Sequence, residues 1–219
     1  MKLMIIVAHP DDEVLGCGGT IARLINEGST GKTLILCDGI SSRDIYDPGD
    51  IMIRKRQSEE ANKILGINEI VNCGLPDQKL DTIPLLEVIK LIEQEIKSYK
   101  PNIIFTHFRN DLNKDHRIVY EAVLTATRPM QGQPVKTIYS FEVASSTEWN
   151  YPLSFIPDTY FDITKTMIEK QKALAVYSEE LRDYPHPRSI EGIELQAQYW
   201  DMRTGGGYKE AFVTVRNFL

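Results

Sequence analysis

The stretch MIIVAHPDDEVLGCGG, residues 4–19, joins a short apolar run to a histidine, a proline and three acids. The run MIIVA does not alternate apolar with polar residues, which is typical of a strand covered on both faces of a parallel sheet. From Asp12 to about Glu27 the apolar residues recur at helical spacing. The stretch therefore predicts a buried strand that leads into a helix, with polar side chains at the junction.

Strands and helices are predicted to alternate along the chain up to about residue 146. The expected strands are residues 4–8, 33–39, 69–74, 102–107 and 137–145, and the expected helices are residues 12–27, 51–65, 83–99 and 114–127. Parallel strands need crossover connections, and helices at this spacing supply them. We therefore expect an α/β fold with a Rossmann-like, mostly parallel sheet and helices on both faces.

The order of elements changes after Ser146. Residues 149–163 are rich in proline and aromatic residues, and two helices, at about 165–178 and 189–203, precede a strand at 211–218. We expect these elements to form a C-terminal α+β cap on the same domain, so that residues 1–219 make a single domain.

The composition favours a globular protein that acts on a small molecule. The net charge is −6 and no dense block of Lys and Arg occurs, so the chain lacks the electrostatic footprint of nucleic-acid binding. The apolar run at the N-terminus meets acids at once, which predicts neither a signal peptide nor a membrane span. Three cysteines without CxxC spacing indicate reduced thiols and a cytoplasmic protein. The oligomeric state stays open, with a homo-oligomer as one alternative.

Polar residues gather at three strand ends, where open α/β sheets bind their ligands. AHPDDE follows the first strand, CDG the second, and THFRNDLNKDHR the fourth. Zn²⁺ takes histidine nitrogen and aspartate oxygen, and a catalytic site leaves one position open beside three protein ligands. His9, Asp12 and His116 form the simplest such set. Each acid alone could instead cap a helix, and each histidine alone could be an ordinary polar residue.

HPDDE before a glycine-rich helix start, with a downstream DHR, resembles the PIG-L or LmbE-like zinc-dependent N-deacetylases. AHPDDE and residues 107–117 carry the resemblance, with weaker support from residues 54–66 and 205–216. It implies that the substrate is an N-acetylglucosamine-type sugar or conjugate and that the cofactor is Zn²⁺, although Fe²⁺ also fits such donors. It further implies that His9, Asp12 and His116 hold the metal and that Asp11 is the general base.

The resemblance implies direct attack of water on the acetamide, without a covalent enzyme intermediate. A carboxylate next to a ligand aspartate can accept the proton of the attacking water and return it to the leaving amine. The oxyanion that forms also needs a hydrogen-bond donor.

One position departs from the pattern of some relatives, which have a histidine three residues before the second metal-binding histidine. This chain has Asn113 there. Either Asn113 donates a neutral hydrogen bond, or another residue such as His186 takes this role. Asp115 is then expected to orient an imidazole.

Two further residues are candidates for binding the substrate. Arg54 aligns with a family arginine that contacts substrate hydroxyls or phosphate, and the alternative is a solvated charge on a helix face. Asp38 could bond a sugar hydroxyl or stabilise the turn at DG. Residues 40–50 and 145–158 are expected to wall the pocket, because loops beyond a rigid sheet usually set specificity.

Two rival functions also fit parts of this pattern. Two histidines and a carboxylate form the facial triad of non-haem iron oxygenases, but those enzymes are generally built on β jelly rolls. The other rival is a module that binds a sugar without cutting it. Loss of Asp11 separates this binding module from a deacetylase, because a binder keeps its affinity whereas a hydrolase loses roughly two to four orders of magnitude in rate.

Overall fold

The computed structural model describes residues 1–218, whose strands form one seven-stranded sheet in the order β3-β2-β1-β4-β5-β7-β6. The strands β1 to β5 pair in parallel, whereas β7 runs antiparallel between β5 and β6. Their bounds are β1 (Lys2–Val7), β2 (Thr30–Cys37), β3 (Glu69–Leu75), β4 (Ile103–His107), β5 (Thr137–Phe141), β6 (Thr159–Asp162) and β7 (Lys209–Asn217).

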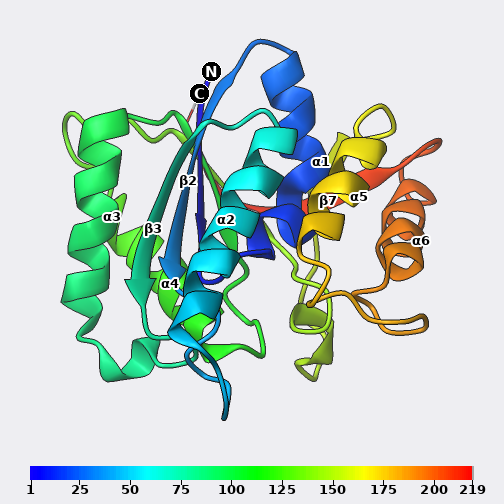
Figure 1. Cartoon of the computed structure of the whole chain (residues 1–219). Coiled ribbons are helices and arrows are strands. Elements are labelled where there is room, and N and C mark those ends of the chain that lie inside the picture. Colours follow the sequence, from blue (N-terminus) through cyan, green and yellow to red (C-terminus); the bar gives the residue numbers. More distant parts are fainter. Residues whose placement is uncertain (219) are drawn as a thin grey trace.

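Helices cover both faces of this sheet (Figure 1). One face carries α3 and α4, and the other carries α1, α2, α5 and α6. The bounds are α1 (Asp12–Asn26), α2 (Pro48–Ile64), α3 (Leu85–Tyr99), α4 (Lys114–Ala126), α5 (Met167–Val176) and α6 (Ile190–Asp201), with short 3-10 helices at Leu80–Thr82 and Thr147–Trp149. The α/β fold with a mostly parallel sheet is therefore confirmed.

Strand β1 explains why its sequence does not alternate. Its side chains point in turn to the two faces, and each face has its own apolar core: Leu3, Ile5 and Val7 pack under α1, whereas Met4 and Ile6 pack under α3 and α4. All five are fully buried. Burying each such side chain contributes about 1.5–3 kcal/mol, so β1 is held from both sides and its end is a rigid platform.

The C-terminal part differs in detail from the expected cap. Its strand β7 inserts beside β5 and extends the central sheet, and β6 lies in the segment rich in proline and aromatic residues, where no strand was predicted. Helix α2 also begins three residues earlier than predicted. Asp47 and Asp50 form a capping box there, in which Asp47 accepts from Gly49 N at 2.6 Å and Asp50 accepts from Asp47 N at 3.0 Å.

Helix α1 is interrupted at Cys17, whose φ of −148° is not helical. The interruption leaves backbone groups without helical partners, and two buried charged side chains satisfy them. Lys170 Nζ donates to Leu15 O at 2.9 Å, and Glu210 accepts from the backbone N–H groups of Gly19 and Thr20. Lys170 and Glu210 pair at 2.6 Å; this brace fixes the helix that carries the HPDDE acids.

Among residues 1–218, none of the helices is both long enough and apolar enough to cross a membrane.

Candidate metal centre and active site

The sheet brings two segments of the chain, about a hundred residues apart, to one point. His9 follows β1, and His116 lies in the first turn of α4, which follows β4. Because β1 and β4 are parallel neighbours, their carboxyl ends meet at the same edge of the sheet. Asp12, at the start of α1, completes the group.

Three donor atoms of these residues converge. Asp12 Oδ2 lies 3.2 Å from both His9 Nδ1 and His116 Nε2, and those two nitrogens are 3.2 Å apart. All three side chains are buried. Asp12 Oδ1 is also buried and has no hydrogen-bond partner within residues 1–218. Two imidazoles and one carboxylate with a spare oxygen match the donors of a catalytic zinc site.

The charges around these histidines also favour a cation. Burial opposes a positive charge on His9, but hydrogen bonds with Asp115 and Asp12 outweigh it and raise its pKa to about 10. For His116 burial is likewise outweighed, here by Asp12 and Asp111, and the pKa rises to about 9. The carboxylates therefore favour a positive charge at this point. A divalent metal bound by neutral imidazoles would supply that charge.

The outer nitrogens of His9 and His116 face carboxylates. His116 Nδ1 lies 3.1 Å from Asp111 Oδ1, and Asp111 in turn accepts from the hydroxyls of Ser146 and Thr147. His9 Nε2 lies 3.3 Å from Asp115 Oδ2. Such outer partners fix the tautomer and the orientation of a ligand imidazole. The geometry thus places Asp115 against an imidazole, as expected.

Asp77 is a site residue that the sequence reasoning missed. It follows β3, is 5% exposed, and its Oδ1 lies 3.2 Å from His9 Nε2. Its other oxygen accepts from Ser42 Oγ at 2.5 Å. An aspartate three residues after the end of the predicted strand at 69–74 was the available signal, and it matches the rule that located the other site residues.

His107, the last residue of β4, supports the centre from behind. Its ring stacks on that of His116, with 3.9 Å between centroids, and its Nε2 accepts from Ala8 N at 2.9 Å. Burial and the neighbouring His116 hold the pKa of His107 well below its ordinary value. His107 therefore packs as a neutral ring, although its sequence segment also suited a ligand.

Cys37 lies close to this centre, but its protonated thiol is a hydrogen-bond donor. Its thiol donates to Asp115 Oδ2 at 3.6 Å, so His9, Cys37 and Asp115 form a second group of donor-capable residues. Burial raises the pKa of this thiol well above its ordinary value. Since a metal binds the thiolate, the group of His9, Asp12 and His116 is the better match for a metal ion.

Asp11 stands between the centre and solvent in an unusual backbone conformation. Its φ of 115° lies in the left-handed region, and its N–H donates to Glu13 Oε2 at 3.0 Å. Glu13 is fully buried and accepts from Tyr177 OH at 2.7 Å. Burial raises the pKa of Asp11 to about 7, although the guanidinium of Arg188 opposes the rise. A buried carboxyl of this kind beside donor residues is suited to proton transfer.

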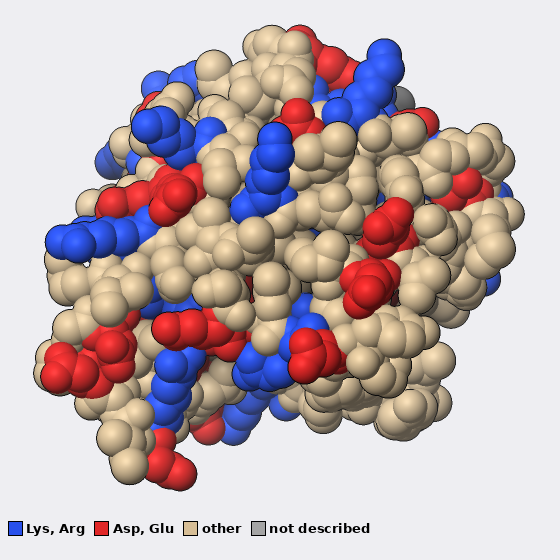
Figure 2. Space-filling view, turned by 45° about the vertical axis from the view of Figure 1, so that its right-hand side comes forward, with Lys and Arg blue, Asp and Glu red and all other residues tan. Residues whose placement is uncertain are grey.

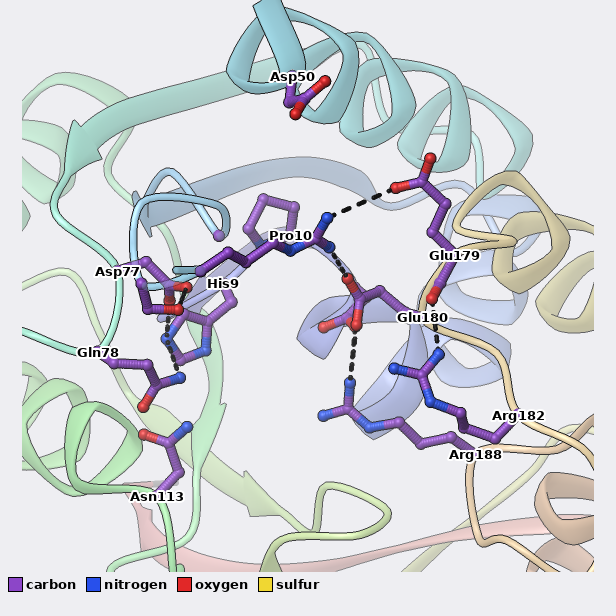
Figure 3. A pocket seen from close by; sticks show the side chains of 14 residues that line it. His9, Pro10, Asp50, Asp77, Gln78, Asn113, Glu179, Glu180, Arg182 and Arg188 are labelled. Carbon is purple, nitrogen blue, oxygen red and sulfur yellow. Dashed lines mark hydrogen bonds and ion pairs between the residues drawn. The ribbon is translucent and has the colours of Figure 1, made fainter. Parts of the chain in front are cut away.

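A cavity of about 600 Å³ opens onto His9 and Asp11. Its two walls face each other in Figure 3, with His9, Asp77, Gln78 and Asn113 on one side and Glu179, Glu180, Arg182 and Arg188 on the other. Apart from Pro10 and Gly39, every lining residue is polar. On the molecular face of Figure 2, acidic and basic side chains are interspersed and no broad basic patch appears. The cavity therefore suits a small polar ligand.

The walls come partly from segments other than those predicted. Residues 40–50 contribute Ser42, Arg43 and Asp50, as expected, but the opposite wall is made by residues 179–188 rather than by residues 145–158. The prediction for 145–158 was wrong, because part of that segment packs on other aromatic side chains instead: Phe155 contacts Phe108, which follows β4, and Trp200 of α6.

The remaining predicted residues divide into two groups. Asn113 lines the cavity, and its Oδ1 accepts from Asp115 N at 2.9 Å, which leaves its amide N–H groups for the cavity. His186 does not line it; its ring packs edge-on against Trp149 and its Nδ1 accepts from Arg188 N. Asp38 accepts from the N–H groups of Ile40 and Ser41, both at 2.8 Å, and so stabilises the turn after β2.

Arg54 is 2% exposed, so the alternative of a solvated helix-face charge is wrong. Its Nη2 donates to Glu180, and its guanidinium lies 5.8 Å from the ring centroid of Tyr177. Glu180 also pairs with Arg43 at 2.8 Å. Burial opposes ionisation of Glu180, but Arg54, Arg188 and Arg43 outweigh it and keep its pKa below the ordinary value. Arg54 thus lies behind the cavity wall, one layer from the ligand space.

Comparison with known proteins bears on this geometry. Residues 4–127 match the family model of PIG-L, described as GlcNAc-PI de-N-acetylase. The chain belongs to the PIG-L family. The matched part contains all the residues of the proposed metal centre and Asp11, and the resemblance drawn from HPDDE and DHR is confirmed.

Relatives and solved structures agree with this assignment to the PIG-L family. The uncharacterized deacetylase YaiS of Escherichia coli is 29% identical over 183 residues, which cover 78% of this chain and 90% of YaiS. Diacetylchitobiose deacetylase of Thermococcus kodakarensis is 26% identical, covering 95% of this chain and 81% of that protein. The crystal structure of the conserved protein TT1542 from Thermus thermophilus superposes with a TM-score of 0.80 at 25% identity, covering 99% and 96%.

Proposed function

We propose that this PIG-L family protein is a metal-dependent hydrolase that removes the acetyl group from an N-acetylglucosamine-type sugar or conjugate. The convergence of His9 Nδ1, Asp12 Oδ2 and His116 Nε2, with the Asp11 carboxyl beside them at the cavity wall, carries this proposal. The names of its family and of its relatives support deacetylation as the reaction.

His9, Asp12 and His116 would hold the metal, with Zn²⁺ as the proposed ion. A divalent metal in such a site lowers the pKa of water to about 7 and polarises a carbonyl group. Asp111 and Asp115 keep the two imidazoles oriented, and His107 packs behind them. The unpartnered Asp12 Oδ1 and the excess of carboxylates are the observations with which a metal fits best.

Asp11 is proposed to be the general base. Its carboxyl faces the cavity and follows His9 by two residues, so it reaches the same space as the metal ligands. It would accept the proton of the attacking water and return it to the sugar nitrogen as the C–N bond breaks, which yields acetate and the free amine. Proton transfer by a positioned side chain contributes typically 10²- to 10⁴-fold.

Asn113 is proposed to donate a hydrogen bond to the oxyanion that forms on the acetyl carbonyl. Its Oδ1 is held by Asp115 N, so the amide orientation is set and the N–H groups face the cavity (Figure 3). His186, the alternative donor, is separated from the cavity by its packing on Trp149. A positioned donor of this kind is worth about 3 kcal/mol in comparable sites.

The test is amine release from a panel of N-acetylglucosamine derivatives: free, phosphorylated, nucleotide-linked and glycosidic. Zinc-loaded wild-type protein is compared with Asp11→Asn, and Lys172→Met, a change at an exposed position on α5 that does not line the cavity, serves as a control. We expect release by the wild type, a loss of roughly two to four orders of magnitude in Asp11→Asn with metal retained, and near-normal rates for Lys172→Met. Sugar binding with equal affinity in wild type and Asp11→Asn, and without amine release, would instead identify a binding module.

A further inference from the structure

Asp11, the proposed general base, is held both at its backbone N–H and at its side-chain carboxylate. Its backbone conformation, with φ of 115°, is unfavourable for a residue other than glycine and persists only where the surroundings enforce it. Glu13 holds the backbone N–H of Asp11. The side chain does not cap α1; its Oδ2 accepts from Arg188 Nη1 at 3.0 Å instead.

Arg188 comes from the other end of the chain and is itself firmly fixed. Its Nε donates to Ser145 Oγ at 2.9 Å and to Ala144 O at 3.2 Å, and its backbone N–H donates to His186 Nδ1. Ser189, the next residue, caps α6 by accepting from Gly192 N at 2.8 Å. Arg188 therefore leaves the start of a helix with its guanidinium anchored, and only its Nη groups are free to face the cavity.

A layer of ion pairs supports this arginine. Glu180 Oε2 lies 3.9 Å from Arg188 Nη1, and the other oxygen of Glu180 is occupied by Arg54 and Arg43. Three arginines share this one carboxylate, so Glu180 neutralises Arg188 only in part. The remaining positive charge of Arg188 is directed to Asp11.

The three cavity-lining arginines differ in what they touch. Arg43 pairs with the glutamates of the outer wall, and Arg182 donates to the backbone carbonyls of Glu179 and Leu181. Among the described residues, Arg188 is the arginine that bonds to a proposed catalytic group. It also brings a permanent cation to a site in which this chain has the neutral Asn113, at the position where some relatives are expected to have a histidine.

We propose that Arg188 is the positioning residue of the general base: its guanidinium holds the Asp11 carboxylate toward the cavity and supplies the fixed positive charge beside it. Arg188 acts through Asp11, which is consistent with the anchoring of its Nε away from the cavity. This inference rests on the proposed function, because it assigns a partner to the base of that reaction.

The test is a double-mutant cycle of Arg188→Ala and Asp11→Asn in the zinc-loaded protein, with Arg203→Ala, an exposed arginine outside the cavity, as the matched control. We expect Arg188→Ala to lower kcat by roughly 10- to 100-fold, the rate equivalent of one hydrogen bond to a charged group, with KM within about threefold. In the Asp11→Asn background the same change should have almost no effect, because residues that act as a unit are not additive. Added guanidinium at a low, non-denaturing concentration should restore part of the kcat of Arg188→Ala, and Arg203→Ala should keep a near-normal kcat.

Additive losses in the cycle, a change confined to KM, or an equal loss in Arg203→Ala would overturn the proposal. A crystal structure of zinc-loaded Arg188→Ala gives a readout that does not depend on activity. In that structure we expect the Asp11 carboxylate to turn away from its wild-type orientation, while His9, Asp12 and His116 stay in place. An unmoved Asp11 would refute the role of Arg188 even if the wild type released no amine, whereas an inactive wild type with a displaced Asp11 in the variant would count against the proposed reaction alone.

Discussion

Two buried groups of charged side chains contact helix α1. They differ in whether other residues of the chain complete their hydrogen bonds and ion pairs. At the interruption of the helix, Lys170 and Glu210 pair at 2.6 Å and together satisfy the backbone groups of Leu15, Gly19 and Thr20. At the helix start, Asp12 keeps a buried oxygen without a partner among residues 1–218, and carboxylates face His9 and His116.

The comparison indicates which buried charges are structural and which are reserved for a ligand. Buried polar groups in folded proteins are nearly always hydrogen-bonded, so an unsatisfied one needs an explanation. The brace has no unmet demand and needs none. At the proposed metal centre the surrounding carboxylates favour a further positive charge, and the cavity beside it would give access to an ion and a substrate.

The largest effect on stability is expected in the brace. Lys170→Met leaves Glu210 buried without its cation, which should lower the free energy of unfolding by about 3–5 kcal/mol. Urea unfolding of wild type and variant measures this. Lys172→Met, an exposed position on the same helix, is the control and should change stability by no more than about 0.5 kcal/mol. Equal stability of Lys170→Met and Lys172→Met would show that the brace is not structural.

A smaller effect, on metal binding rather than on folding, is expected at Asp111. Asp111→Asn keeps one acceptor oxygen, places an NH2 group where the second oxygen accepts from Thr147 or Ser146, and loses the charge opposite His116 Nδ1. Zinc affinity should fall by roughly 10- to 100-fold, as measured by competition with a chelating dye. Asp81→Asn, which removes an acid that pairs with Lys114 at the surface, should leave the affinity unchanged. Tight zinc binding by Asp111→Asn would argue against His116 as a ligand.

The smallest effect is expected at Glu142, which lines a small cavity with Lys170 and Glu210. Its Oε1 accepts from Trp200 Nε1 at 2.5 Å, and burial raises its pKa from 4.5 to about 7. Because the folded state holds this proton more tightly than the unfolded state, the stabilisation is complete below about pH 4.5 and is lost as the pH rises through about 7.

Glu142→Gln should remove this component of the pH dependence. Urea unfolding from pH 4.5 to 8 measures the unfolding free energy of both proteins. As the pH rises, the wild type should lose stability relative to Glu142→Gln. Parallel stability curves across this range would mean that Glu142 does not titrate inside the fold.

Much of the site could be predicted from residues that are close in sequence to strand ends. The apolar run before His9 identified a doubly covered strand, and the spacing of HPDDE placed three acids at its carboxyl end. The same rule applied to β4 brought His116 to the same edge. These predictions needed only local periodicity and the fact that parallel neighbours end together.

Other features depend on contacts that no local pattern encodes. Arg188 and Asp11 are 177 positions apart, and Lys170 and Glu210 are 40 positions apart on a helix and a strand that meet only when the sheet closes. The insertion of β7 between β5 and β6 likewise decides which C-terminal segment reaches the cavity. From the sequence, His186 was the C-terminal residue expected to reach the cavity. In the structure it is Arg188, two residues later, that lines the cavity and bonds to Asp11.

The sequence by itself therefore determined the layered α/β framework, the family and the grouping of His9, Asp11, Asp12 and His116, because periodicity and strand ends are properties of short segments. Only the tertiary structure decided which carboxylate faces which imidazole, which wall the C-terminal part supplies, and which cation meets Asp11. Those outcomes depend on side-chain packing between elements distant in the chain, where a displacement of one helix turn exchanges one residue for another.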